Sequence, residues 1–507
     1  MNIVLVTGQL AYDVINSIVA NYVNARSGVN VTVIKLPIQV AAMMNEKFLE
    51  RELPKYMELL RNADVIVVPG YTSGDLTEVS KIIGKPVVKG VKYAGDIPLM
   101  LDALLNGLQL SPITPADELI QQYLVGVEKT ILKSARQKAF SENYFLIGGI
   151  NGIPVSRHYP CVLAEVFISE DQSSISVGSD ILKYADVLVI GFPYEFSRER
   201  AKRIIELLRG VGKPLGIDSP DPELIKEISP FIDIVMNISL KDIQGSPDLL
   251  DMVKDKPVVI VPDHPEHEID NLLLAVQKIR EMGLTKIIVD PVLNPPLLGL
   301  AHSLKRYMAL REKLPNTPLL MGVGNVTELM DADSIGVNAL LASIGVEIGI
   351  ELYLTTEASV KTRGCVRELR RALDMMVISK TMNRPPKDLS TNLLVLKDKR
   401  LKGYMPMGAQ LVVEANKRPR KRVDPGGCVK IYVDHTAGKI ILEHFPLGSS
   451  RPDIAIAGED PYAILGEIME RNLISLPEHY FYIGLELCKA FISLKTGKEY
   501  VQDMDMF

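Results

Sequence analysis

Residues 144–357 repeat one pattern, in which a short apolar run is followed by a helical pattern and then by another apolar run. Each run is rich in Val, Ile and Leu, and polar or turn residues follow it. Such runs, separated by helical patterns, indicate parallel strands buried on both faces. Eight of these units in a segment of this length predict a closed (β/α)8 TIM barrel. The runs are Phe145–Ile150, Val187–Ile190, Pro214–Ile217, Ile234–Met236, Pro257–Val261, Lys286–Val289, Pro318–Val323 and Ile350–Leu354.

Short polar residues follow most of these runs. In a TIM barrel the reactive groups lie where strands end, so such side chains are expected to meet at one mouth. Taken singly, each of them is often only a helix N-cap, and that alternative stays open for each. The residues are Asn151, Asp218, Asn237, Asp263 with His264, Asp290, Asn325, and Thr355 to Glu357.

The chain of 507 residues is too long for one hydrophobic core. Residues 1–140 alternate short apolar strands with helical patterns, which predicts a doubly wound, Rossmann-like α/β domain. Residues 141–384 form the predicted barrel, and residues 385–507 a small C-terminal α+β domain. A helix over Ile113–Lys138 is expected to lead into the barrel. The expected strands outside the barrel are Ile3–Val6, Val31–Ile34, Val65–Val68, Pro86–Val88, Gln410–Glu414, Val429–Asp434 and Ile440–His444.

The charge balance gives no reason to expect nucleic-acid binding, because 57 Lys and Arg face 62 Asp and Glu. The first residues hold no basic leader and no apolar run long enough for a membrane span, so we expect a soluble, cytoplasmic protein. Two glycine turns, Thr7–Gln9 and Pro69–Asp75, present backbone amides to an anion or only close tight turns. Neither has the spacing of a nucleotide-binding motif.

Carboxylates and amides around a barrel mouth suit a ligand whose edge carries N–H donors and carbonyl acceptors. A buried polar group without its partner costs about 1–3 kcal/mol, so such a site selects a complementary ligand. A fused heterocycle such as a pterin presents that kind of edge.

The order and spacing of these segments resemble the pterin-binding barrel of dihydropteroate synthases and corrinoid-linked methyltetrahydrofolate methyltransferases. The matching segments are Gly149–Asn151, Ile217–Asp218, Met236–Ser239, Val289–Pro291 and Met321–Asn325. Together with the flanking domains, the whole arrangement is similar to archaeal dihydropteroate-synthase-related proteins.

The resemblance implies that Asp218, Asn237 and Asp290 bind the pterin ring. It places Asn151 in the region of the diphosphate and a Mg²⁺ ion. In the methyltransferase branch, the residue at the position of Asn325 contacts the pterin near its methylated nitrogen. Asp263, His264 and Glu357 are further candidates at the mouth.

The cationic segments of the synthases are absent here. Synthases carry Ser-Arg-Lys after the seventh strand and Arg-x-His-Asp at the eighth, whereas this chain has Gly324–Thr327 and Tyr353–Glu357. Lys361 and Arg363 are the nearest basic residues that could replace them, and Arg157 could face a phosphate. The alternative is that these cations only cap a helix or are solvated.

Three functions follow as hypotheses. The first is a transferase of folate or tetrahydromethanopterin synthesis that joins a dihydropterin methyl diphosphate to p-aminobenzoate or its ribofuranosyl phosphate derivative. The second is methyl transfer between a methylated pterin and a corrinoid protein, without diphosphate or magnesium. The third is a pterin-binding protein without catalysis. The family analogy also predicts a homodimer.

Overall fold

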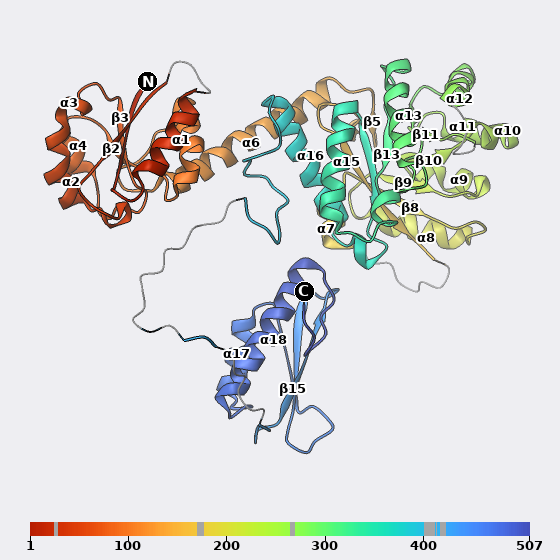
Figure 1. Cartoon of the computed structure of the whole chain (residues 1–507). Coiled ribbons are helices and arrows are strands. Elements are labelled where there is room, and N and C mark those ends of the chain that lie inside the picture. Colours follow the sequence, from red (N-terminus) through yellow and green to blue (C-terminus); the bar gives the residue numbers. More distant parts are fainter. Residues whose placement is uncertain are drawn as a thin grey trace.

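The computed structural model describes residues 1–24, 29–169, 177–263, 269–399, 411, 413–415 and 422–506. These residues form an N-terminal α/β unit, a central barrel and a C-terminal α+β unit (Figure 1). No helix among these residues is long and apolar enough to cross a membrane. His264 lies outside the described residues, as do Gln410 and Val412 of the predicted strand Gln410–Glu414. The other three residues of that segment are not in a strand, so this strand was wrongly predicted.

The N-terminal unit is built on a four-stranded parallel sheet with the order β2-β1-β3-β4. Each predicted strand is present, and the runs of Val and Ile in β1 and β3 are buried on both faces. One core lies on each face, and Ile3 and Leu5 belong to one while Val4 and Val6 belong to the other. The elements are β1 (Asn2–Thr7), α1 (Tyr12–Asn24), β2 (Asn30–Lys35), α2 (Glu46–Glu52), α3 (Met57–Leu60), β3 (Val65–Val68), α4 (Thr77–Ile83), β4 (Val87–Lys89) and α5 (Ile97–Leu105).

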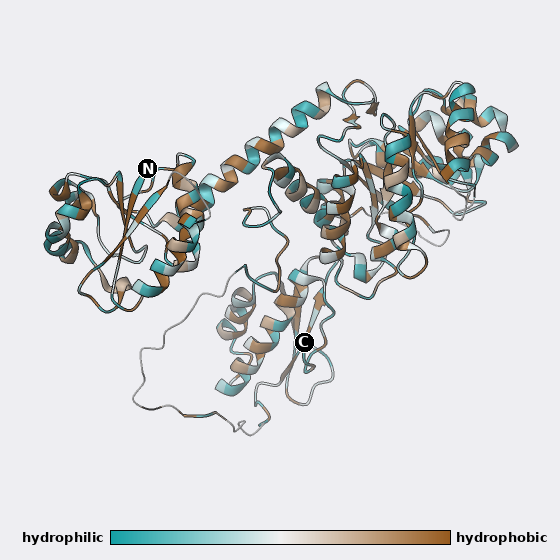
Figure 2. Ribbon diagram, turned by 45° about the horizontal axis from the view of Figure 1, so that its top comes forward, coloured by the Kyte–Doolittle hydropathy of each residue, from teal (hydrophilic) through white to brown (hydrophobic). Residues whose placement is uncertain are grey.

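A long helix, α6 (Ala116–Ser141), runs from the N-terminal unit to the barrel (Figure 1). Along it, hydrophilic and hydrophobic residues alternate (Figure 2). Its buried Glu128 accepts hydrogen bonds from the backbone N–H groups of Ser390 and Thr391 at 2.6 and 2.8 Å. The segment that follows the barrel therefore folds back onto α6.

The central sheet has eight parallel strands in the order β12-β11-β10-β9-β8-β7-β14-β13. A parallel bridge between Val289 and Leu319 joins β12 to the start of β13 and closes the cylinder. The predicted TIM barrel is thus confirmed. Its strands are β7 (Cys161–Phe167), β8 (Val187–Gly191), β9 (Leu215–Asp218), β10 (Ile234–Ile238), β11 (Val258–Ile260), β12 (Ile287–Val289), β13 (Leu320–Gly322) and β14 (Leu352–Thr356).

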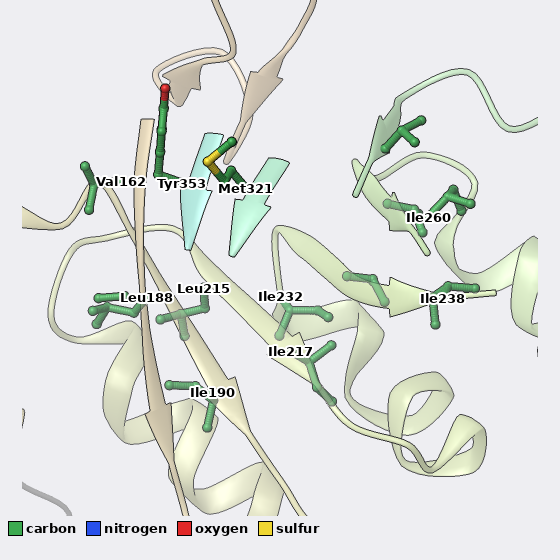
Figure 3. Packing of buried hydrophobic residues seen from close by; sticks show 14 of the residues in the cluster. Val162, Leu188, Ile190, Leu215, Ile217, Ile232, Ile238, Ile260, Met321 and Tyr353 are labelled. Carbon is green, nitrogen blue, oxygen red and sulfur yellow. The ribbon is translucent and has the colours of Figure 1, made fainter. Parts of the chain in front are cut away.

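Helices surround the barrel and pack on the outward-facing strand residues. Figure 3 shows this layer, with Val162, Leu188, Ile217 and Tyr353 among the buried side chains of one continuous cluster. The helices are α7 (Ser179–Tyr184), α8 (Arg198–Arg209), α9 (Pro222–Ile228), α10 (Leu240–Gly245), α11 (Pro247–Val253), α12 (Ile269–Glu281), α13 (Leu300–Lys313), α14 (Gly324–Thr327), α15 (Ser334–Ile348) and α16 (Cys365–Thr381).

The prediction that Phe145–Ile150 is the first barrel strand is wrong. This segment forms an antiparallel hairpin from β5 (Leu146–Ile147) and β6 (Ile153–Pro154), and the first strand is β7. Ile147 and Val155 are fully buried in the cluster that fills the barrel interior. The Cβ that a substitution would add at Gly148 would lie 3.0 Å from Pro214, which precedes β9. The hairpin therefore closes the amino-terminal end of the barrel.

The C-terminal unit consists of an antiparallel sheet in the order β15-β16-β17 and two helices. β15 and β16 were predicted, and β17 was missed. The elements are β15 (Cys428–Asp434), β16 (Lys439–Phe445), β17 (Ile454–Gly458), α17 (Pro461–Glu470) and α18 (Pro477–Thr496).

Candidate functional site

Side-chain alternation places one layer of polar residues at the carboxyl mouth of the barrel. Leu163 and Ile288 belong to the interior cluster, so the residues two positions later, Glu165 and Asp290, lie one layer nearer the mouth. Asp218 ends β9 in the same region: burial raises the pKa values of Glu165 and Asp290, and the charge of Asp218 adds to both increases. Three acidic groups from strands far apart in the chain thus lie at the same mouth above an apolar core.

Asp218 and Asn237 form a direct pair. The Asn237 side-chain Nδ2 donates to Asp218 Oδ2 at 2.6 Å. Asn237 adopts a left-handed backbone conformation with φ 57°, which asparagine tolerates better than most residues. Burial raises the pKa of Asp218 to about 6, and the hydrogen bond from Asn237 opposes this increase. Both residues lie where the sequence predicted.

Asp290 is the most buried acid of the mouth, with 6% of its surface exposed. Its Oδ1 accepts hydrogen bonds from the Tyr307 hydroxyl and the Val292 backbone N–H, each at 2.7 Å. Burial raises the pKa of Asp290 to about 6 despite these donors. Val292 has φ 65°, a region that β-branched residues rarely adopt, and such strain costs about 1–3 kcal/mol. The loop after β12 therefore holds Asp290 in a fixed orientation at the cost of local strain.

Glu165 was not found from the sequence. It lies within β7, where it pairs with Val189 and Thr356 of the neighbouring strands. Glycine at position 191 leaves room for it, because an added Cβ there would lie 2.8 Å from the Glu165 Oε1. Burial raises the pKa of Glu165 to about 7, and the charges of Asp218 and Glu328 add to this increase. Glu165 therefore occupies the first-strand position that the sequence had assigned to Asn151.

Three other predicted mouth residues lie at strand ends and bond to the backbone. The Asn325 side chain donates to the Leu293 carbonyl at 2.9 Å. Asp263 accepts from the Lys241 N–H at 3.1 Å at the start of α10, and Glu357 accepts from the Val366 N–H at 3.1 Å near the start of α16. Burial raises the pKa of Glu357. Asp263 and Glu357 thus cap the starts of helices, which was the alternative interpretation to a binding role.

Asn151 and Arg157 do not lie at the mouth, and their predicted placement is wrong. Asn151 is exposed in the turn between β5 and β6, at the amino-terminal end of the barrel. Arg157 Nε lies 2.7 Å from Glu351 Oε1, just before β14 begins. Arg311 binds the other oxygen of this fully buried carboxylate at 2.7 Å. Arg157 therefore takes part in an ion network at the base, opposite the mouth.

Lys361 and Arg363 follow β14 at the carboxyl side. The Lys361 ammonium lies 2.7 Å from Asp331 Oδ1 in an exposed ion pair. Arg363 is also exposed, directly after the short 3-10 helix Val360–Thr362. Because exposed ion pairs are weak, Lys361 remains available to an anion.

Two family models match parts of the chain. Residues 423–503 match PterinBD-DUF4346, and residues 1–92 match a family of unknown function, DUF6513. The uncharacterized protein MJ0107 of Methanocaldococcus jannaschii is 30% identical over 535 residues, which cover 100% of this chain and 99% of that protein. The chain belongs to the MJ0107 family. This match and the match to the PterinBD-DUF4346 family model confirm the predicted resemblance to archaeal dihydropteroate-synthase-related proteins.

Solved structures with a similar fold include two dihydropteroate synthases and one synthase of another kind. Dihydropteroate synthase of Yersinia pestis with a pterine-sulfa conjugate is 16% identical, with a TM-score of 0.36, and the match covers 46% of this chain and 98% of that one. The Thermus thermophilus enzyme in complex with 4-aminobenzoate is 16% identical, with a TM-score of 0.35 and coverage of 46% and 98%. A truncated 3-deoxy-D-arabino-heptulosonate 7-phosphate synthase from Thermotoga maritima is 13% identical, with a TM-score of 0.33 and coverage of 50% and 96%.

Proposed function

We propose that this member of the MJ0107 family binds a reduced pterin at the carboxyl mouth of its barrel and joins a dihydropterin methyl diphosphate to an arylamine. The observation that carries the proposal is the arrangement of the Asp218–Asn237 pair and the buried Asp290 around one mouth. These groups offer acceptors and a donor to the N–H and carbonyl edge of a flat heterocycle. The arylamine is p-aminobenzoate or its ribofuranosyl phosphate derivative.

In this reaction the protein mainly binds and orients. The bond between the pterin methylene carbon and the diphosphate oxygen breaks, the amine nitrogen forms a bond to that carbon, and the amine releases a proton to solvent. Carboxylates beside the ring stabilise the positive charge that develops on the pterin as diphosphate leaves. Asp290 and Asp218 are placed for this role, and both hold their orientation through hydrogen bonds.

Magnesium fits the mouth through Glu165. Mg²⁺ is commonly held by one or two carboxylates together with substrate phosphates and water. Within the described ranges, no group of three or more His, Cys, Asp or Glu side chains forms a metal cage, so the substrate itself would supply the remaining ligands. When bound, the ion would neutralise charge on the leaving diphosphate. This assignment replaces Asn151, which lies at the other end of the barrel.

Methyl transfer from a methylated pterin is the second candidate. It is favoured by the acidic character of the mouth, where Glu165, Asp218 and Asp290 all have raised pKa values, and by the position of Arg157 at the opposite end. A substrate without phosphates needs no cations. Burial raises the pKa of Glu165 to about 7, which suits this carboxyl group to protonate a departing pterin nitrogen near neutral pH.

The test combines a binding assay and a product assay on the full chain. Dihydropterin methyl diphosphate is titrated into the wild type, Asp218→Asn, Asp290→Asn and the control Asp251→Asn, which changes an exposed acid of α11. Diphosphate release is then followed with magnesium and each arylamine. Losing a buried hydrogen-bonding partner costs about 1–3 kcal/mol, so we expect about 5- to 150-fold weaker pterin binding in the two mouth variants.

The outcomes separate the hypotheses. Diphosphate release that falls in Asp218→Asn and Asp290→Asn but not in Asp251→Asn supports the transferase. Pterin binding without release, with the same dependence on the mouth residues, rejects the condensation and leaves methyl transfer or binding alone. No binding of any reduced pterin rejects the site itself.

A further inference from the structure

The N-terminal unit contains a second cavity, independent of the barrel mouth. It has a volume of about 580 Å³ and lies at the carboxyl ends of β1, β3 and β4, where the loops after all three strands contribute to its lining. In the order β2-β1-β3-β4, the direction of strand addition reverses between β1 and β3. In doubly wound sheets, ligands bind in the crevice at such a reversal.

The walls of this cavity are apolar and its rim is aromatic. Ile97 and Met100 of α5 and Ile15 of α1 lie along the inner wall. At the rim, Tyr71 stands edge-to-face with Tyr93 at 5.9 Å, and the Tyr71 hydroxyl donates to that of Tyr93 at 2.8 Å. Two hydrogen-bonded phenol rings beside an apolar wall form a surface suited to a planar ring.

A glycine brings the two tyrosines together. An added Cβ at Gly70 would lie 2.5 Å from the Gly90 carbonyl oxygen, so the loops after β3 and β4 meet backbone to backbone. Tyr71 and Tyr93 extend from these two loops, and Tyr71 is 46% exposed. The rim is therefore fixed in place by backbone packing, while one of its rings remains accessible.

Thr7 places an unsatisfied hydroxyl in this cavity. It is the last residue of β1, it has no exposed surface, and its Oγ1 has no hydrogen-bond partner in the described part of the chain. Alternation along β1 puts it on the face of Ile3 and Leu5, which is the face that α1 and α5 cover. Most buried polar groups are hydrogen-bonded, so an unpaired hydroxyl that lines a cavity indicates a ligand atom.

The polar end of the cavity favours an anion. Lys92 is the one charged residue among the described residues that line it, and its ammonium lies 3.5 Å from Glu118. The loop after β1, whose Leu10 and Ala11 line the cavity, leads into the 13-residue helix α1. A helix N-terminus and a cation both stabilise a negative group. The exposed Asp13 in the first turn of α1 does not line the cavity.

We propose that this cavity binds a small planar aromatic compound that carries one acidic group, a phosphate or a carboxylate. The ring lies against Tyr71 and Tyr93, and the acidic group accepts a hydrogen bond from the Thr7 hydroxyl near Lys92 and the start of α1. This assignment does not depend on the reaction proposed for the barrel.

The test uses two probes on the full chain, FMN for the phosphate and 4-aminobenzoate for the carboxylate. Binding is followed by flavin fluorescence and by calorimetry in the wild type, Thr7→Val and Tyr71→Leu. Thr32→Val, on the exposed face of β2, is the matched control, and Asp290→Asn reports any binding in the barrel. We expect at least one probe to bind, with about five- to tenfold weaker binding in Thr7→Val and Tyr71→Leu and no change in Thr32→Val, while any binding that is lost in Asp290→Asn belongs to the barrel.

Protein stability gives an independent measurement. Valine has the shape of threonine without the hydroxyl, so Thr7→Val should unfold at the same temperature as the wild type or higher if Oγ1 has no partner in the free protein. A lower unfolding temperature would show that the hydroxyl is already satisfied internally and would reject the proposal. It is also rejected if neither probe binds, or if binding is unchanged in Thr7→Val and Tyr71→Leu.

Discussion

Asp290→Asn should stabilise the barrel at neutral pH while it weakens pterin binding. Burial raises the pKa of Asp290 from its ordinary value of 3.8 to about 6. At about 1.4 kcal/mol per pKa unit, ionising this carboxyl group in the folded protein costs up to about 3 kcal/mol. An amide oxygen still accepts hydrogen bonds from Tyr307 and Val292, so the substitution removes the charge and keeps both contacts.

The direction of the pKa shift of Asp290 determines the pH range over which the stability of the barrel changes. A carboxyl group whose pKa is higher in the folded state binds more protons there, so the wild-type barrel loses stability as pH rises from about 4 to about 6. The asparagine variant lacks this loss. Native-state hydrogen exchange in β12 and α13 measures the local free energy of unfolding without interference from the other domains. A difference between variant and wild type that is constant from pH 4 to pH 7 would refute a raised pKa at Asp290.

Two further predictions concern residues away from the mouth. Glu351→Gln leaves two arginines at the base of the barrel without their counter-ion, and we expect a loss of about 3–5 kcal/mol in a denaturation assay. The exposed pair of Asp331 gives the comparison, since Asp331→Asn should cost less than about 1 kcal/mol. Glu128→Ala should release the segment that folds onto α6, so hydrogen exchange at residues 388–394 should rise, and unchanged exchange would contradict the role of Glu128.

Most barrel strands were predictable because they are buried on both faces. Seven of the eight predicted runs coincide with strands, from β8 to β14. The same patterning placed Asp218, Asn237 and Asp290 at one mouth. In a parallel barrel, residues at the carboxyl ends of the strands all lie on the same face. Local sequence was sufficient here because each strand buries its own apolar side chains on the two faces of the sheet.

The first strand was missed because two apolar segments, Phe145–Ile150 and β7, both precede the second strand and only one of them belongs to the barrel. Phe145–Ile150 is as apolar as a barrel strand, but its glycines at 148 and 149 have positive φ and turn the chain into a hairpin. The true strand, β7, has Glu165 at its centre, which interrupts the apolar sequence after Ala164. The apolar run Cys161–Ala164 could have marked it, with Cys161 and Leu163 below the mouth and the acid of Glu165 at it.

The placement of Arg157 depended on that error. A cation after a supposed first strand was expected at the mouth, and the shift of the strand moves it to the opposite end. Its partner Glu351 is distant in sequence and lies before the last strand, so no local pattern could pair them. Ion pairs between distant segments depend on where each side chain lies in the closed barrel. The sequence predicts the order of the strands but not these positions.

The effect of Glu165→Gln on substrate binding distinguishes the two candidate reactions, because for a pterin diphosphate this effect should change sign when magnesium is added. Without a metal, its carboxylate repels a pterin diphosphate, and a nearby like charge costs on the order of 1 kcal/mol, so Glu165→Gln should bind this substrate about fivefold more tightly. With magnesium, the same carboxylate would help to hold the ion against the diphosphate, and Glu165→Gln should then bind more weakly. A methylated pterin without phosphates should show neither change. Equilibrium binding of both compounds with magnesium and with a chelator measures all four cases. If Glu165→Gln has the same effect on pterin diphosphate binding in both conditions, Glu165 does not hold the metal.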